Sequence, residues 1–304
     1  MDRRRFLRTS LAGAFTVPLT AEAQATGQRH RVGLLNAAAS GRPEAAFREG
    51  LRVLGYVDGG NVVVDSRFAE GRAERLPVLA RELLGAKPDV IVTFGTAAAQ
   101  AMKAATTTTP IVMAFAGDPI GTRLVASLAR PGGNVTGMSL ATPELAGKRL
   151  ELLKEVVPKL TRLTVLGDLS SRQLEVRQTQ DAARALGLTV ALVECTRAEG
   201  LVGALGEVSH TRPEAVLVLN SALTLTHRSQ IIDFAVKNRV PLVSSTREWA
   251  VGGALMTYAP SVIDSSRRAA TFVDKILKGA NPATLPIEQP TTFELVINRA
   301  SRES

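Results

Sequence analysis

The 304 residues are enough for two domains of ordinary size, and the single cysteine, Cys195, excludes an intramolecular disulfide and a cysteine-ligated metal cluster. The formal net charge is +9, but the basic residues are scattered among acidic ones, and only 4% of the residues are aromatic. A nucleic-acid partner is therefore not expected, because surfaces that bind nucleic acid gather Lys and Arg in a stripe interleaved with aromatic residues.

The first 23 residues have the pattern of a twin-arginine export signal. The paired Arg3-Arg4 precedes a mildly apolar stretch over residues 11–20, which is too short to span a bilayer. Ala21 and Ala23 then stand at the two positions that a signal peptidase reads. We expect residues 1–23 to be removed as a signal peptide and the exported protein to be soluble in the periplasm. An amphipathic N-terminal helix or arm is the alternative.

The next part of the chain alternates short β-branched runs with longer amphipathic segments, a rhythm that predicts crossover units on a parallel sheet. The predicted strands cover residues 31–36, 61–67, 89–94 and 111–116. The predicted helices between them cover residues 43–54, 72–84 and 97–105. A turn cluster, Pro131-Gly-Gly-Asn134, ends this series before the short apolar run 135–140.

A second series follows and repeats the same logic. Its predicted strands are residues 163–167, 189–193, 215–220, 242–244 and 254–258. Its predicted helices are residues 143–156, 171–186, 198–208 and 226–238, followed by a long helix over 261–278 and an extended, edge-like segment over 285–289. The sequence therefore predicts an α/β protein with two Rossmann-like lobes. Residues 30–140 with about 260–290 form the first lobe, 141–259 the second, and 291–304 a C-terminal tail.

Glycines and small polar residues gather directly after the predicted strands. They are Asn36, Gly95-Thr96, Gly117-Asp118, Asn220-Ser221 and Ser244-Ser245-Thr246. Ligands of open parallel sheets bind outside the carboxyl ends of the strands, where helix N-termini offer unpaired N–H groups to an anion. Gly95 would let a ligand approach the main chain, and Thr96 would cap the helix that starts at residue 97. The same residue types also serve as turn and cap residues, so that reading stays open at each position.

Long ordered segments of the sequence resemble the substrate-binding proteins of ABC uptake systems in the tryptophan-binding-protein-like family. They are residues 46–56 (AFREGLRVLGY), 68–71 (FAEG), 89–96 (DVIVTFGT), 109–112 (TPIV), 117–119 (GDP), 124–137 (LVASLARPGGNVTG) and 148–154 (KRLELLK). The resemblance covers most of residues 31–298 and is looser over 168–214. It implies the type I periplasmic-binding-protein fold, in which two hinged lobes with parallel sheets close on a small molecule.

Position by position, the resemblance implies ligand contacts from both lobes. The first lobe would supply Asn36, Gly95, Thr96, Ala97, Gly117 and Asp118, and the second Asn220, Ser221, Ser245 and Glu248. Asp118 would pair with a ligand ammonium and Thr96 with its carboxylate. The alternative for Asp118 is a turn in which its side chain binds its own backbone. Four aromatic residues would either stack on an aromatic ligand or belong to the core: Phe94, Phe115, Trp249 and Tyr258.

The function that the resemblance implies is an extracytoplasmic solute-binding protein of an ABC uptake transporter. We expect a monomer that binds a small molecule, such as an amino acid or an aromatic amino-acid-like solute, and docks on a membrane permease without cofactor or metal. The alternatives are a ligand-sensing module for a membrane receptor and an α/β enzyme acting on a small metabolite. Cys195 is expected to be a buried small hydrophobe, and the three histidines lack the spacing of a metal pair. In place of the asparagine-rich loop of relatives the chain has Gly167-Asp168-Leu169-Ser170.

Overall fold

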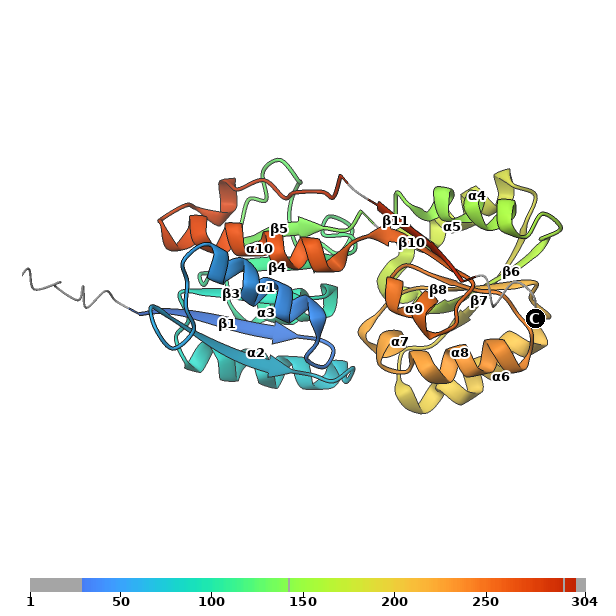
Figure 1. Ribbon diagram of the computed structural model, residues 1–304, viewed down its shortest axis with the longest axis horizontal. Helices are drawn as coiled ribbons and strands as arrows, with labels where there is room; N and C mark the ends of the chain where they lie inside the picture. The colour runs from blue at the N-terminus through green and yellow to red at the C-terminus, as the bar shows by residue number, and fades with distance from the viewer. Residues whose placement is uncertain (1–28, 142, 292, 299–304) are drawn as a thin grey trace, which may run out of the picture.

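Two separate β-sheets divide the protein into two α/β lobes (Figure 1). The computed structural model describes residues 29–141, 143–291 and 293–298, so the expected signal peptide lies outside the described residues. The first sheet has the order β2-β1-β3-β4-β5, and all its pairs are parallel. Its strands are β1 (His30–Asn36), β2 (Val62–Phe68), β3 (Val90–Phe94), β4 (Ile111–Ala116) and β5 (Val135–Ser139).

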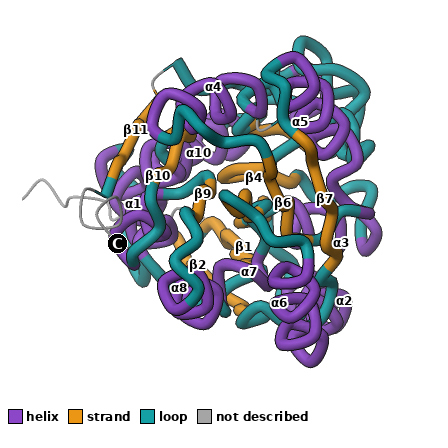
Figure 2. The backbone as a smooth tube through the Cα atoms, turned by 90° about the vertical axis from the view of Figure 1, so that its right-hand side faces the viewer, coloured by secondary structure: helices purple, strands orange, loops and turns teal. Residues whose placement is uncertain are grey.

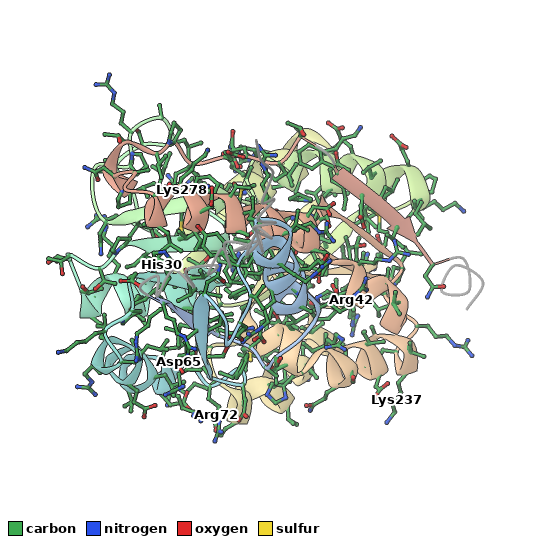
Figure 3. All side chains as sticks on the ribbon, turned by 60° about the vertical axis from the view of Figure 1, so that its left-hand side comes forward. His30, Arg42, Asp65, Arg72, Lys237 and Lys278 are labelled. Carbon is green, nitrogen blue, oxygen red and sulfur yellow. The ribbon has the colours of Figure 1, made fainter. Side chains whose placement is uncertain are left out.

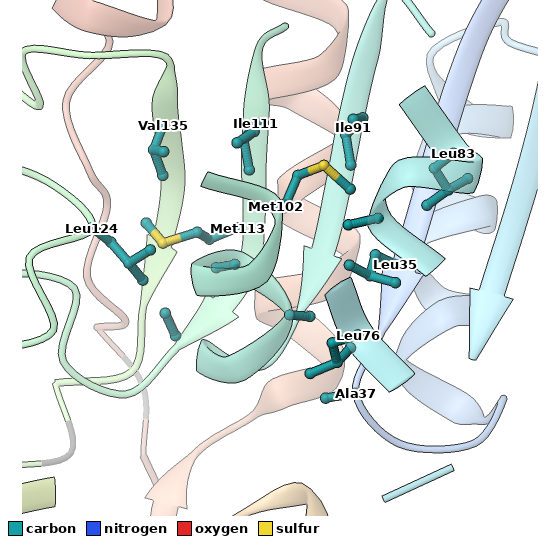
Figure 4. Close-up of a cluster of buried hydrophobic side chains, with 14 of the residues drawn as sticks. Leu35, Ala37, Leu76, Leu83, Ile91, Met102, Ile111, Met113, Leu124 and Val135 are labelled. Carbon is teal, nitrogen blue, oxygen red and sulfur yellow. The ribbon is translucent and has the colours of Figure 1, made fainter. Parts of the chain in front are cut away.

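Four helices cover the two faces of this sheet. They are α1 (Arg42–Val53), α2 (Leu76–Gly85), α3 (Thr96–Ala105) and, from much later in the chain, α10 (Val262–Leu277). Alternate residues of a strand point to opposite faces, and β3 uses both: Val90 and Val92 pack under α1 and α10, while Ile91 packs with Met102 of α3 (Figure 4). Burial on both faces explains why this strand is apolar at every position except Thr93.

The second sheet has the order β11-β10-β9-β8-β6-β7 and is parallel except for β11. Its strands are β6 (Arg162–Gly167), β7 (Thr189–Glu194), β8 (Ala215–Val218), β9 (Leu242–Ser244), β10 (Met256–Pro260) and β11 (Phe293–Ile297). Its helices are α4 (Ala146–Val156), α5 (Gln173–Ala185), α6 (Leu201–His210), α7 (Ala222–Thr226), α8 (Arg228–Lys237) and α9 (Arg247–Gly252). Helices α4 and α5 lie on one side of the strands, and α6 and α8 lie on the other (Figure 2). Short 3-10 turns occupy Ala73–Arg75, Ser170–Arg172, Ala198–Gly200 and Pro282–Thr284.

Over the described residues the chain passes between the lobes three times: from β5 to α4, from β10 to α10, and from the segment before β11 into β11. Glu288 still belongs to the first lobe, because its backbone bonds to Gly137 and Ser139 beside β5. The next strand, Phe293–Ile297, pairs antiparallel with β10 of the second lobe. The expectation of a tail over 291–304 is therefore wrong for β11, which adds an edge strand to the second sheet.

Charged side chains project from the outer faces of the elements, as Arg72, Lys237 and Lys278 show (Figure 3). Among the described residues, none of the helices has the length and apolar character needed to cross a bilayer. The sequence analysis did not predict the two short helices α7 and α9. It expected one helix over 226–238, where the chain forms α8 after α7 has ended at Thr226.

The packing of α10 on α1 depends on Gly50, and its replacement by alanine is expected to destabilise the first lobe. A Cβ at Gly50 would lie 2.5 Å from the Arg267 carbonyl oxygen and 2.9 Å from the Ala270 Cβ. Overpacking of this kind costs about 1–3 kcal/mol of unfolding free energy. Gly206→Ala is the control, because Gly206 lies in α6 with nothing within 4 Å of its added Cβ and alanine there should stabilise the helix. Urea unfolding midpoints would contradict this if both variants shifted alike.

Candidate functional site

A cavity of about 610 Å³ lies between the two lobes, at the carboxyl ends of their strands. The first lobe lines it with the segments that follow β1, β3 and β4, and the second lobe with those that follow β6, β8 and β9. A volume of this size is typical of pockets that enclose a small molecule. The topology therefore places the cavity where open parallel sheets bind ligands.

Nine of the ten residues predicted from the sequence line this cavity. They are Asn36, Gly95, Thr96, Ala97, Gly117, Asp118, Asn220, Ser221 and Ser245. The tenth, Glu248, does not; it lines two smaller cavities that it shares with Arg42 and Arg247. Glu248 is in the first turn of α9, one of the two helices missing from the sequence analysis, and this turn carries its side chain away from the large cavity.

The first lobe forms one wall of the cavity, and a buried polar side chain bonded to the backbone helps to shape it. Asn36 is buried: its Oδ1 accepts from the Ala38 N–H at 2.9 Å, and its Nδ2 donates to the Ala39 carbonyl at 3.2 Å. Gly95 has φ +93°, a backbone conformation that favours glycine, and it brings the chain directly from β3 into α3. Asn36 and Gly95 therefore shape the wall.

Thr96 does not cap α3, contrary to the sequence-based expectation. The N-cap is Gly95, without a side-chain hydrogen bond, and the Thr96 Oγ1 instead accepts from the Gly117 N–H at 3.1 Å. This bond ties the loop after β4 to the start of α3. The first-turn N–H groups of α3 stay free of a side-chain cap where Thr96 and Ala97 line the cavity, so a carboxylate can dock there.

Asp118 forms the turn that the sequence analysis gave as its alternative role. Its Oδ1 accepts from the Gly121 N–H at 2.7 Å, as in a turn in which an aspartate binds the backbone three residues later. The residue is nonetheless half-exposed and lines the cavity. The turn therefore fixes the orientation of the carboxylate at the cavity wall.

The second lobe holds its predicted residues by side-chain contacts. The buried Trp249 indole donates its Nε1–H to the Asn220 Oδ1 at 3.2 Å, which orients the amide. Ser221 caps α7 reciprocally with Thr224: each side chain accepts from the backbone N–H of the other. Ser245, at the end of β9, is buried and lines the same cavity.

The sequence analysis missed a polar stretch at the start of α5 that lines the cavity. It comprises Asp168, Ser170, Arg172, Gln173, Glu175 and Arg177. These residues follow β6 and so obey the same strand-end rule, but the sequence analysis noted this loop only as a departure from the resembled family. Among the described residues, three carboxylates and three guanidiniums therefore line the cavity, from Asp118, Asp168, Glu175, Arg123, Arg172 and Arg177.

Glu175 lies at the centre of a nearly buried charge cluster. Its Oε1 accepts from the Arg149 Nη1 at 3.3 Å and its Oε2 from the Arg172 Nη1 at 3.1 Å. The side chains of Arg149 and Glu175 are 1% and 5% exposed. Burial lowers the pKa of the Arg149 guanidinium from its ordinary value, and Glu175 opposes that shift. Arg149 also donates from Nε to the Tyr258 carbonyl, while its Nη2 is buried without a hydrogen-bond partner in the described part of the chain.

Two of the four aromatic candidates lie at the cavity. Phe94 and Phe115 line it and meet edge to face, with ring centroids 5.9 Å apart. Trp249 is fully buried in the core of the second lobe, and Tyr258 stacks on Phe293 of β11 outside the cavity lining. Of these aromatic residues, Phe115 offers the more accessible apolar surface, because Phe94 is almost entirely covered.

The described residues hold no group of three His, Cys, Asp or Glu side chains placed to bind a metal ion. Cys195 is buried in the core of the second lobe, and burial raises the pKa of its thiol above the ordinary value. Its Sγ donates to the Arg197 carbonyl. Cys195 therefore packs as a small apolar residue, away from the cavity lining.

Known proteins share this architecture. The sequence model described as "ABC transporter substrate binding protein" matches residues 38–304. A tyrosine-binding protein of Clostridioides difficile (strain R20291) is 25% identical over 259 residues, which cover 84% of this chain and 74% of that protein. The structure of the ABC domain from Streptococcus pneumonia in complex with L-Trp is 25% identical, with a TM-score of 0.85 over 91% of this chain and 94% of that one.

Two further solved structures are similar to this chain. A conserved domain protein from Vibrio cholerae has a TM-score of 0.86 at 24% identity, and the ligand-free, open structure of a substrate-binding protein with adhesive properties from Clostridium difficile has 0.64 at 22%. Coverage of this chain is nearly equal, at 91% and 90%, and that of the other chains is 94% in both cases. The chain belongs to the family of ABC transporter substrate-binding proteins and has the type I periplasmic-binding-protein fold.

Proposed function

We propose that this substrate-binding protein captures an amino acid with an aromatic side chain in the cleft between its lobes and presents it to a membrane permease. The observation that carries the proposal is the make-up of the first-lobe wall, where Asp118, the N-terminus of α3 and Phe115 line one cavity. A carboxylate, an array of free N–H groups and an apolar ring complement the ammonium, the carboxylate and the side chain of such a ligand.

Two relatives support this ligand class. One is a tyrosine-binding protein, and the other is a structure in complex with L-Trp; each is 25% identical to this chain. The second lobe adds guanidiniums and carboxylates in equal number near the start of α5, which suits a zwitterion better than a ligand with a large net charge.

Binding is proposed to act by population shift between an open form and a closed form. The ligand favours the closed form because it contacts both walls of the cleft, and no bond of the ligand is broken. The location proposed for this cycle is the periplasm, reached through a twin-arginine signal in residues 1–23, with a monomer as the working unit.

Calorimetric titration of the mature protein tests the ligand class. L-tryptophan and L-tyrosine are expected to bind and to raise the melting temperature, because a ligand held only by the native state stabilises it. Indole-3-propionate, which lacks the ammonium group, should bind more weakly, and D-ribose should not bind. Binding of the sugar in preference to both amino acids would overturn the proposal.

A further inference from the structure

The FAEG segment at residues 68–71, which the ligand site does not use, brings the two lobes into direct contact. Gly71 of the first lobe faces Thr226, the last residue of α7 in the second lobe. A Cβ placed on Gly71 would lie 2.5 Å from the Thr226 Oγ1 and 2.9 Å from its Cβ. Non-bonded carbon atoms do not approach to 2.9 Å, so the contact allows no side chain at position 71 while the lobes keep this position.

The first-lobe side of this contact is fixed to the ligand site. The Gly71 N–H donates to the Ala37 carbonyl and the Ala69 N–H to the Asn36 carbonyl, each at 2.9 Å. Asn36 and Ala37 line the cavity. Between them, Glu70 binds Arg72 and Arg75 through one carboxylate oxygen, at 2.9 Å in each case. The turn that carries Gly71 is therefore held in place from both sides.

The second-lobe side is fixed as well. Ser221 and Thr224 form the reciprocal cap of α7, whose first residue, Ala222, lines the cavity and packs against the apolar core of the first lobe. Thr226 stands at the other end of the same helix. Helix α7 thus rests on the first lobe at both of its ends, at the cavity through Ala222 and outside the cavity lining through Thr226.

We propose that Gly71 sets the ligand affinity by allowing the lobes to close. The absence of a side chain at position 71 leaves room for the Thr226 side chain of the other lobe. Rotation of the Thr226 side chain would move Oγ1 but not Cβ, and α7 is held by its cap. A side chain at position 71 is therefore accommodated by opening the hinge, since both contacting segments are fixed within their own lobes. Because a ligand in the cleft needs the closed form, the apparent affinity falls with the fraction of molecules that can close.

This inference rests on the proposed function, since it assumes a ligand that binds between the lobes. A substitution at Gly71 has two effects, a clash with the other lobe and a strained backbone, and the test has to separate them. Gly71 has φ +80°, so alanine is strained there whatever the space. Gly59 has the same φ of +80° in the first lobe but nothing within 4 Å of an added Cβ. Gly59→Ala therefore reproduces the backbone strain of Gly71→Ala without the contact between lobes. Thr226→Gly removes the opposing side chain, and the double variant Gly71→Ala/Thr226→Gly relieves the clash.

Titration with L-tryptophan and L-tyrosine is expected to give wild-type affinity for Gly59→Ala, a loss of about tenfold or more for Gly71→Ala, and recovery in the double variant. Melting temperatures of the free proteins should fall equally in the two alanine variants. Equal affinities of Gly71→Ala and Gly59→Ala would overturn the proposal, and so would a loss that the double variant does not recover.

If the wild type binds neither amino acid, the ligand class is wrong, but the contact is still tested without ligand. Small-angle scattering of the free proteins then compares the radius of gyration of the two alanine variants. A larger radius for Gly71→Ala, restored in the double variant, supports the role of Gly71 in closure. Equal radii for Gly71→Ala and Gly59→Ala contradict it.

Discussion

Replacement of Glu175 by alanine is expected to lower the free energy of unfolding by about 3–5 kcal/mol, because it leaves a buried positive charge without its partner. Arg149 is 1% exposed, and its only charged neighbour at hydrogen-bond distance among the described residues is Glu175. The remaining bond of the guanidinium, from Nε to the Tyr258 carbonyl, does not neutralise it. For a protein of this size the melting temperature should fall by about 10 °C.

The matched variant Arg149→Met should cost less than Glu175→Ala. Glu175 keeps its ion pair with Arg172, at 3.1 Å, and methionine fills much of the space left by the arginine stem. The double variant Arg149→Met/Glu175→Leu removes the buried pair altogether and is expected to be more stable than Glu175→Ala alone. Urea unfolding followed by circular dichroism measures the order of the three variants. A double variant less stable than Glu175→Ala would show that the pair stabilises the fold beyond mutual neutralisation.

The cluster around Glu175 also shows which parts of the site a sequence cannot provide. Arg149 lies on α4 and Glu175 on α5, and their pairing depends on how two helices pack on the same face of the second sheet. No spacing or motif encodes that contact. Each residue alone reads as an ordinary charge on an amphipathic helix.

The strands, by contrast, could be predicted from the sequence because the apolar pattern that marks each of them is local. The apolar run that became β3 has no polar residue except Thr93 between Asp89 and Gly95, and this is typical of a strand covered on both faces. The positions after the strands followed from the rule that ligands bind at the carboxyl ends of parallel sheets. The prediction for Glu248 came from the family resemblance instead, and that resemblance did not give the direction in which the first turn of α9 carries the side chain.

Loop hydrogen bonds were the least predictable feature. Thr96 has the residue type and the position of a helix cap, but its hydroxyl accepts from the Gly117 N–H of the neighbouring loop. The N–H groups of the helix and any other donor that the fold brings close compete for the same hydroxyl oxygen. The order of the strands in the sheet decides which donor lies within reach. The site residues could therefore be located from the sequence, whereas their bonding required the structure.

Replacement of Asp118 by asparagine is expected to weaken the binding of L-tryptophan by about 100-fold with little change in stability. Asparagine keeps an Oδ1 that can accept from the Gly121 N–H, so the turn survives, but the charge that would pair with the ligand ammonium is lost. Asp118→Ala should also destabilise the free protein by about 1 kcal/mol, because it leaves that N–H without its acceptor. Asp65→Asn is the control: Asp65 lies on β2, outside the cavity lining, and its replacement removes the same charge (Figure 3).

The ligand provides the second half of this test. If Asp118 pairs with the ammonium group, the wild type should prefer L-tryptophan to indole-3-propionate, and Asp118→Asn should lose most of that preference, because the variant no longer has the charge that distinguishes the two compounds. Affinities for both compounds, measured by calorimetry in both proteins, give the coupling between the carboxylate and the amine. An unchanged preference in Asp118→Asn would mean that Asp118 serves only the turn with Gly121 and that another carboxylate of the cleft meets the amine.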